Sequence, residues 1–178
     1  MRITCCLLLL TLLSGCTGLP ERVTPVKPFE IERYMGKWYE IARLDHSFER
    51  GLSRVTAEYT LQPDDSVAVL NSGYSDKNGK KSQAIGIAKF VKASNEGHLK
   101  VSFFGHFYSS YVIFGLDQNN YQYAFVSGYN KNYLWLLSRT PEVSPELKDI
   151  FVQESKKLGF DTDQLIWVDQ STFSVDSR

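Results

Sequence analysis

The chain has 178 residues, 20 basic and 20 acidic side chains, and a hydrophobic content of 43%. A chain of this length and composition can form one domain with its own apolar core. Its formal net charge is zero and it contains no basic stripe, which argues against a nucleic-acid-binding protein.

The first fifteen residues have the pattern of a secretory signal peptide. Arg2 supplies a positive charge, and the apolar run over residues 3–13 is shorter than the roughly 20 residues that span a bilayer. The letters L-S-G-C follow and end at Cys16. They resemble the lipobox of bacterial lipoproteins, in which cleavage before the cysteine leaves it acylated. We therefore predict lipidation at Cys16; the alternative is an ordinary secretory peptide with an incidental cysteine.

The other two cysteines, Cys5 and Cys6, lie inside this segment, so the processed chain would form no internal disulfide. In Gram-negative lipoproteins an Asp directly after the acylated cysteine usually retains the protein in the inner membrane. Thr17 occupies that place here, so the resemblance implies the outer membrane, with the domain on the periplasmic side. Residues 16–28 are rich in proline and predict an extended tether.

Short β-rich segments separated by Asp-, Asn- and Gly-containing turns fill the middle of the chain. Connections this short join antiparallel neighbours, so the pattern predicts a sandwich or an up-and-down barrel. Eight strands close a barrel that is wide enough for one small ligand. The predicted strands are residues 38–44, 55–61, 67–74, 82–91, 99–108, 111–116, 121–127 and 133–138.

One late segment has helical periodicity. Ser144 is a favourable N-cap, Pro145 suits the first helical position, and Gly159 suits the position just after the helix. We expect its apolar face to pack on the outside of the sheet, followed by a short final strand at residues 165–168. The residues of that face are Leu147, Ile150, Phe151 and Leu158.

Three short motifs resemble the signatures of the lipocalin family. Gly36 and Trp38 match its G-x-W motif, in which the Trp plugs the closed end of the barrel. Arg139 matches the third signature, whose Arg lies across that Trp as a cation–π contact. Of the second signature only Tyr121 is present. The resemblance covers residues 29–170 and is nearest to the branch that contains bacterial lipoproteins and apolipoprotein D.

This resemblance implies an all-β fold, an eight-stranded up-and-down antiparallel barrel with the helix packed outside. It also implies a small hydrophobic ligand, lysophospholipid or fatty acid, a role in envelope maintenance under stress, and no cofactor. The predicted organisation is a signal peptide (1–15), a lipidated N-terminus and tether (16–28), a lipocalin domain (29–170) and a C-terminal tail (171–178).

Strand alternation predicts which side chains face the ligand. If Arg139 points inward to meet Trp38, period two places alternate residues of the same strand inward, towards the mouth. The same phasing favours Ala124 and Val126 inward on the neighbouring strand, whereas a slip of one residue would exchange the two faces. The predicted ligand-binding residues are Tyr111, Ile113, Tyr133, Trp135 and Leu137.

A polar headgroup needs donors or a cation near the rim. Tyr111 and Trp135 could supply a hydroxyl and an indole N–H, although plain core packing is the alternative for both. Arg50, Arg54 and Lys81 could attract a phosphate, or could be solvated surface charges.

Two other classes of function stay open. A lipid-modifying enzyme would need catalytic groups, and the three histidines lie in no catalytic or metal-binding motif. We expect His98 in a turn, His46 in the first long loop, and His106 among aromatic wall residues. The other alternative is a surface interaction module with a vestigial pocket. We predict a non-enzymatic binding protein without a metal site; the sequence leaves homodimer formation open.

Overall fold

The computed structural model describes residues 17–171. The predicted signal peptide, Cys16 and all but the first residue of the predicted tail lie outside the described residues. None of the helices between residues 17 and 171 has the length and apolar content that crossing a membrane requires.

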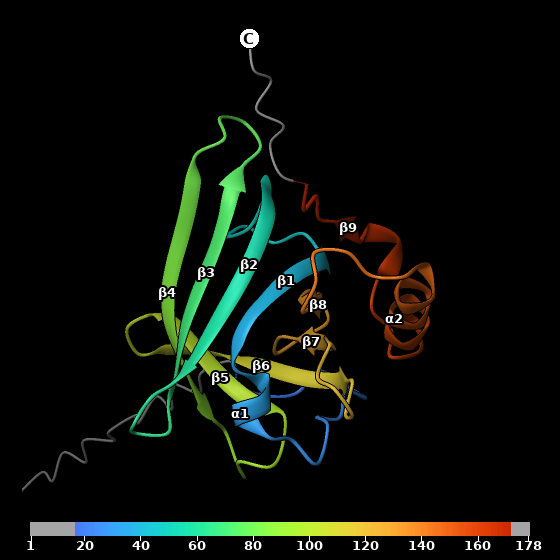
Figure 1. Ribbon diagram of the computed structural model, residues 1–178. Helices are drawn as coiled ribbons and strands as arrows, with labels where there is room; N and C mark the ends of the chain where they lie inside the picture. The colour runs from blue at the N-terminus through green and yellow to red at the C-terminus, as the bar shows by residue number, and fades with distance from the viewer. Residues whose placement is uncertain (1–16, 172–178) are drawn as a thin grey trace, which may run out of the picture.

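Nine antiparallel strands form one sheet in the order β2-β3-β4-β5-β6-β7-β8-β1-β9, and β1 also pairs with β2 (Figure 1). The first eight strands therefore close into an up-and-down barrel, which confirms the predicted fold. The strands are β1 (Gly36–Arg43), β2 (Leu52–Leu61), β3 (Val67–Ser75), β4 (Lys81–Phe90), β5 (His98–Phe104), β6 (Phe107–Leu116), β7 (Tyr123–Ser127), β8 (Leu134–Ser138) and β9 (Ile166–Trp167).

Alternation along the strands produces two apolar cores, one inside the barrel and one between the barrel wall and the C-terminal helix. Ala124 and Val126 belong to the inner core, whereas Tyr123 and Phe125 pack with the outer one. The predicted phase of this strand is therefore confirmed. Because successive side chains of a strand point to opposite faces, the same strand contributes to both apolar cores.

Helix α2 (Pro145–Lys157) covers the outer core (Figure 1). The Ser144 hydroxyl accepts the Leu147 backbone N–H at 3.3 Å, and Gly159 follows the helix at a φ of 85°. Phe151 is fully buried, and its ring centroid lies 5.1 Å from that of Phe125. The predicted helix is confirmed, except that Ile150 is 49% exposed because it lies at the edge of the apolar face.

Two short helices, α1 (Ile31–Tyr34) and η1 (Thr162–Gln164), were not predicted. One turn of helix carries too few apolar positions to show a period. Helix α1 packs under the barrel, where the Trp38 indole N–H donates to the Tyr34 carbonyl at 2.8 Å.

The short final strand β9 pairs with β1 at the end of β1 that β2 does not reach. Strand β2 pairs with β1 only from Gly36 to Tyr39, and β9 takes the free edge at Ala42 and Arg43. The Gln170 side-chain amide donates to the carbonyls of Glu40 and Val55 at 2.7 and 2.9 Å. The C-terminal segment therefore joins β1 to β2 where the two strands separate.

The strand boundaries differ from the prediction by up to four residues, and the largest differences lie at the β5–β6 turn. The β5–β6 turn falls at Gly105 and His106, so Phe107 and Tyr108 begin β6 and do not end β5. Four aromatic residues around this turn favour a strand on both sides of it. Because Gly105 is the one turn-forming residue between them, the sequence predicts a single continuous strand. Tyr121 lies in the turn before β7 with a φ of 55°.

The N-terminal segment lies against the barrel. Val26 donates its backbone N–H to the Ile113 carbonyl at 2.8 Å and accepts from Gly97 at 3.0 Å. The Gly18 carbonyl accepts the Ser110 hydroxyl at 2.6 Å, and Val23 is only 4% exposed. Residues 18–26 therefore do not form the free tether that composition suggested. Proline fixes an extended backbone, which suits a bound edge segment as well as a linker.

Candidate ligand-binding site

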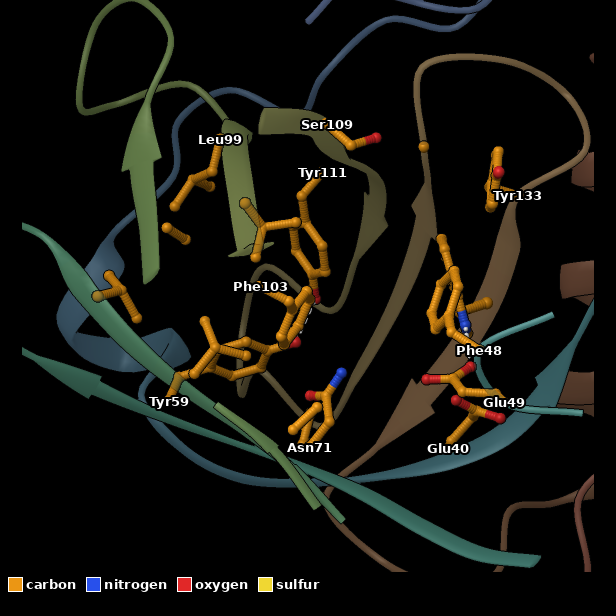
Figure 2. Close-up of a pocket in the computed structure, with 18 of the residues that line it drawn as sticks. Glu40, Phe48, Glu49, Tyr59, Asn71, Leu99, Phe103, Ser109, Tyr111 and Tyr133 are labelled. Atoms are coloured by element: carbon orange, nitrogen blue, oxygen red, sulfur yellow. Dashed lines mark hydrogen bonds between the residues drawn. The ribbon is translucent and has the colours of Figure 1, made fainter. Parts of the chain in front are cut away.

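The barrel encloses a cavity of about 790 Å³, within the range of small-molecule sites (Figure 2). Its lining includes residues of the β1–β2, β5–β6 and β7–β8 connections at the open end, and Ile31 and Tyr34 of α1 line its floor. The wall is mainly apolar and aromatic; it includes Val55, Val69, Leu99 and Phe103. Such a wall accommodates a hydrocarbon chain.

The signature residues lie together below this floor. The Arg139 guanidinium carbon lies 3.8 Å from the centroid of the Trp38 ring, and Trp38 is fully buried. Arg139 also donates to the carbonyls of Arg33 and Lys37, at 2.8 and 2.9 Å. Gly36 has a φ of +90°, which favours glycine. These contacts give the group a structural role at the closed end.

Tyr121 belongs to the same closed end. It is buried, its hydroxyl accepts the Glu30 backbone N–H at 3.0 Å, and the Arg33 guanidinium lies 4.1 Å from its ring centroid. Its carbonyl also accepts from Arg139 Nε at 3.3 Å. Tyr121 therefore ties the N-terminal helix to the β6–β7 turn.

Four of the five predicted ligand-binding residues line the cavity: Tyr111, Tyr133, Trp135 and Leu137. Ile113 does not. It points inward as predicted but is fully buried in the inner core, in the same cluster as Phe29, Trp38 and Tyr121. At the level of Ile113 other side chains already fill the barrel interior, below the cavity floor. The alternation along one strand shows that a side chain points inward, but not how deep the cavity reaches.

Three tyrosines meet at the cavity floor. The Tyr111 hydroxyl lies 2.8 Å from that of Tyr34 and 2.9 Å from that of Tyr59. Burial raises the pKa of each phenol, so all three remain protonated at physiological pH. The Tyr111 hydroxyl therefore lies at the floor and not at the rim, where the sequence analysis placed a headgroup contact.

A buried ionic cluster lies in the wall nearer the mouth. Glu40 Oε1 accepts from Arg43 at 2.7 Å. Glu49 Oε2 accepts the Trp135 indole N–H at 3.1 Å and lies 3.0 Å from His46 Nε2. All four titratable residues are less than 10% exposed, and the two carboxyl groups lie side by side at the cavity surface (Figure 2).

The two carboxyl groups titrate differently. Burial, followed by the neighbouring Glu49, raises the pKa of Glu40 well above its usual range, against the opposing effect of Arg43. Burial would also raise the pKa of Glu49, but His46 and the Trp135 N–H more than offset it, so this pKa is lowered. The sequence pattern does not reveal this cluster. Glu40 follows Trp38 at period two and could have been predicted to face inward; the loop residue Glu49 could not.

Glu40 should make stability depend on pH. Because its pKa is raised in the folded state, folding takes up a proton between the raised and the ordinary value, and stability falls as pH rises through the raised pKa. One proton corresponds to at most about 1.4 kcal/mol per pH unit. Urea unfolding of wild type and Glu40→Gln from pH 5 to 8 should show a difference that varies with pH. The exposed Glu58→Gln is the control; equal pH profiles for all three proteins would contradict the assignment.

The rim is hydrophobic and not cationic. Phe48, Phe104 and Phe107 line the opening and are 57%, 81% and 80% exposed. Among the described residues that line the cavity, none is Lys or Arg.

The three predicted phosphate contacts lie elsewhere. Arg50 pairs with Asp45 at 2.7 Å, and Arg54 and Lys81 line a separate groove on the outer face of the barrel. The strand phase at Arg54 is shifted by an irregularity in the β2–β3 pairing, which the sequence pattern does not reveal.

The histidines are placed as follows. His46 lies in the β1–β2 loop as predicted, whereas His98 is not a turn residue: it begins β5, is 3% exposed and lies 3.2 Å from the Ser110 hydroxyl. His106 is exposed in the β5–β6 turn at the rim. Between residues 17 and 171 no group of three or more His, Cys, Asp or Glu side chains is arranged to hold a metal ion.

The chain belongs to the lipocalin family: the family model described as a lipocalin-like domain matches residues 29–170. It is 58% identical over 170 residues to the outer membrane lipoprotein Blc of Vibrio cholerae, covering 96% of this chain and 99% of that one. It is 47% identical to the protein of the same name from Escherichia coli K12, covering 85% of each. Mouse apolipoprotein D is 31% identical, covering 80% of this chain and 78% of that one.

These relatives confirm the predicted branch of the family, and their names agree with the predicted outer-membrane localisation. Among solved structures, insecticyanin from the tobacco hornworm superposes with a TM-score of 0.68 at 24% identity, covering 86% of this chain and 87% of that one. That similarity supports the fold alone.

Proposed function

We propose that this protein is a lipid-anchored lipocalin of the outer membrane that binds one single-chain lipid, lysophospholipid or fatty acid, in envelope maintenance under stress. The observation that carries the proposal is the apolar cavity of about 790 Å³ in the barrel. The names of the Vibrio and Escherichia relatives support the location. Burial of an acyl chain contributes about 0.8 kcal/mol per methylene group.

The charges of the wall bear on the headgroup. Glu40 and Glu49 are exposed to the cavity, and no Lys or Arg among the described residues lines it. A carboxylate that entered would lose water without gaining a counter-ion. We therefore favour a zwitterionic lysophospholipid over an ionised fatty acid of equal chain length.

Gly18, two residues after the proposed anchor, is bound to a residue that lines the cavity. Gly18 is bound to Ser110, and Phe107 at the rim lies three residues earlier on β6, about 10 Å along the strand. The β3–β4 connection, which lies at the same end of the barrel as the β5–β6 turn, carries Lys77 and Lys80. Basic residues near an anionic bilayer contribute roughly 1 kcal/mol each. We propose that acylated Cys16 holds the mouth against the membrane.

Tryptophan fluorescence tests the binding role, because Trp135 lines the cavity, Trp38 lies below its floor, and Trp167 lies on the surface. We expect saturable quenching by palmitoyl-lysophosphatidylcholine, with weaker binding of palmitate. Trp135→Phe should lose most of the quenching and Trp167→Phe should retain it. If calorimetry finds neither lipid bound more tightly than about 10 μM, which corresponds to roughly 7 kcal/mol, the proposal fails.

The same incubation distinguishes binding from catalysis. We expect lysophosphatidylcholine to be recovered unchanged by mass spectrometry. Appearance of glycerophosphocholine and free fatty acid would instead identify a lipid-modifying enzyme. Calorimetry that finds no binding in the wild type, with Trp135→Phe unchanged, would favour the interaction module.

A further inference from the structure

The three phenolic hydroxyls at the cavity floor have one more hydrogen-bond donor than the hydrogen bonds among them require. Each hydroxyl of Tyr34, Tyr59 and Tyr111 has one proton to donate. Two contacts join them, Tyr34 to Tyr111 and Tyr59 to Tyr111, and each contact uses one proton. Whichever way the two bonds run, one phenolic O–H has no acceptor in the described protein.

This unused donor is enclosed. Tyr34 and Tyr59 are 2% and 8% exposed, and all three tyrosines line the cavity. A buried donor without an acceptor costs about 1–3 kcal/mol. The hydroxyls of Tyr59 and Tyr111 meet inside the cavity (Figure 2), so an acceptor within it can reach them.

An unused acceptor lies on the same inner wall as Tyr59. Asn71 lines the cavity, and its buried Oδ1 has no hydrogen-bond partner in the described protein. On the paired strands Asn71 lies opposite Ala57, and Tyr59, two residues further along, lies opposite Val69. Residues two apart on a strand point to the same face, so Asn71 and Tyr59 are diagonal neighbours on the inner wall.

We propose that Tyr34, Tyr59, Tyr111 and Asn71 form a polar subsite for a hydroxyl group carried on the acyl chain of the ligand. A hydroxyl is the group that can accept from the unused phenol and donate to Asn71 Oδ1 together. A plain hydrocarbon chain leaves both protein groups unpaired. The inference rests on the proposed lipid-binding role and adds that the cavity selects hydroxylated chains.

Charge does not explain this subsite. The nearby cation, Arg139, lies on the far side of Trp38 and donates to the backbone carbonyls of Arg33 and Lys37. The floor therefore offers neutral hydrogen-bonding groups and no counter-ion, which suits an alcohol and not a carboxylate or phosphate.

The test compares stearoyl-lysophosphatidylcholine with its 12-hydroxystearoyl and 18-hydroxystearoyl analogues by calorimetry. The measured quantity is the ratio of each hydroxylated affinity to the plain one, in wild type, in Asn71→Leu and in the triple variant Tyr34→Phe, Tyr59→Phe, Tyr111→Phe. We expect at least one ratio to fall about 2- to 10-fold in each variant, as for a single neutral hydrogen bond.

A matched control sharpens the result. Tyr129→Phe, at the mouth, should keep the wild-type ratio. The triple variant should unfold at a temperature no lower than wild type, because it removes the one unpaired buried donor and removes both partners of each of the two hydrogen bonds.

The outcomes separate the two proposals. Ratios that are unchanged in both Asn71→Leu and the triple variant would overturn the subsite, and would mean that the unused groups bind water only. Binding of plain stearoyl-lysophosphatidylcholine would in that case still support the lipid-binding role. Failure of all three lipids to bind wild type would instead overturn the proposed function.

Discussion

Trp38→Ala is expected to lower the free energy of unfolding by about 3–5 kcal/mol, the usual cost of removing a fully buried aromatic side chain. The change opens a void below the cavity floor. It also removes the ring under Arg139 and the donor to the Tyr34 carbonyl. Urea unfolding followed by circular dichroism measures the effect, and Trp167→Ala on the surface should cost less than 1 kcal/mol, roughly the range of surface substitutions.

If Trp38→Ala does not fold, Trp38→Phe and Arg139→Lys test the same contact more gently. Lysine cannot reproduce the planar stacking of the guanidinium or the fixed geometry in which it donates to three carbonyls, so Arg139→Lys should destabilise measurably. Equal stability of Arg139→Lys and wild type would show that the pair does not hold the closed end.

The double variant Phe104→Ser, Phe107→Ser is expected to weaken membrane association of the unacylated protein by about 3 kcal/mol, or roughly 100-fold. The estimate takes about 1.5 kcal/mol for each exposed ring that enters the bilayer interface, the lower end for burying an apolar side chain. Flotation with vesicles of phosphatidylethanolamine and phosphatidylglycerol measures the partition coefficient. Calorimetry with monomeric lysophospholipid should show little change, because the two rings lie at the rim.

Ile150→Ser is the matched control for the rim, because Ile150 is an exposed apolar residue on the helix outside the barrel. Its vesicle binding should equal that of wild type. If the double variant binds vesicles normally but no longer self-associates in light scattering, the rim contacts a second copy of the chain. That result would contradict the membrane-facing mouth and support the homodimer that the sequence left open.

The closed end of the barrel could be predicted because its determinants are local in sequence or fixed by period two. Gly36, Trp38 and Arg139 stand in short motifs, and the phase of β7 follows from alternation at Ala124 and Val126. The helix was predictable for a similar reason, since Ser144, Pro145 and Gly159 mark its ends within one short segment.

The polar interior could not be predicted in the same way. The Glu40, Arg43, His46 and Glu49 cluster depends on how the β1–β2 loop folds back over the wall, which no periodicity encodes. Ile113 was predicted to bind the ligand, but it lies in the filled core below the cavity. Its inward phase was right, but the depth of the cavity floor depends on Trp38 and α1, which lie far from it in sequence.

If Cys16 is acylated as proposed, the attachment of residues 18–26 to the barrel limits how far the protein can move from the membrane. Thr17 alone separates the proposed acylated position from Gly18, so the backbone between these two residues spans about 7 Å at most. A free segment over residues 16–28 would reach roughly 45 Å. A barrel held this closely by the proposed anchor would diffuse in the plane of one membrane, with one face turned toward it. Delivery of lipid to a second, distant membrane would first require these N-terminal residues to detach from β6.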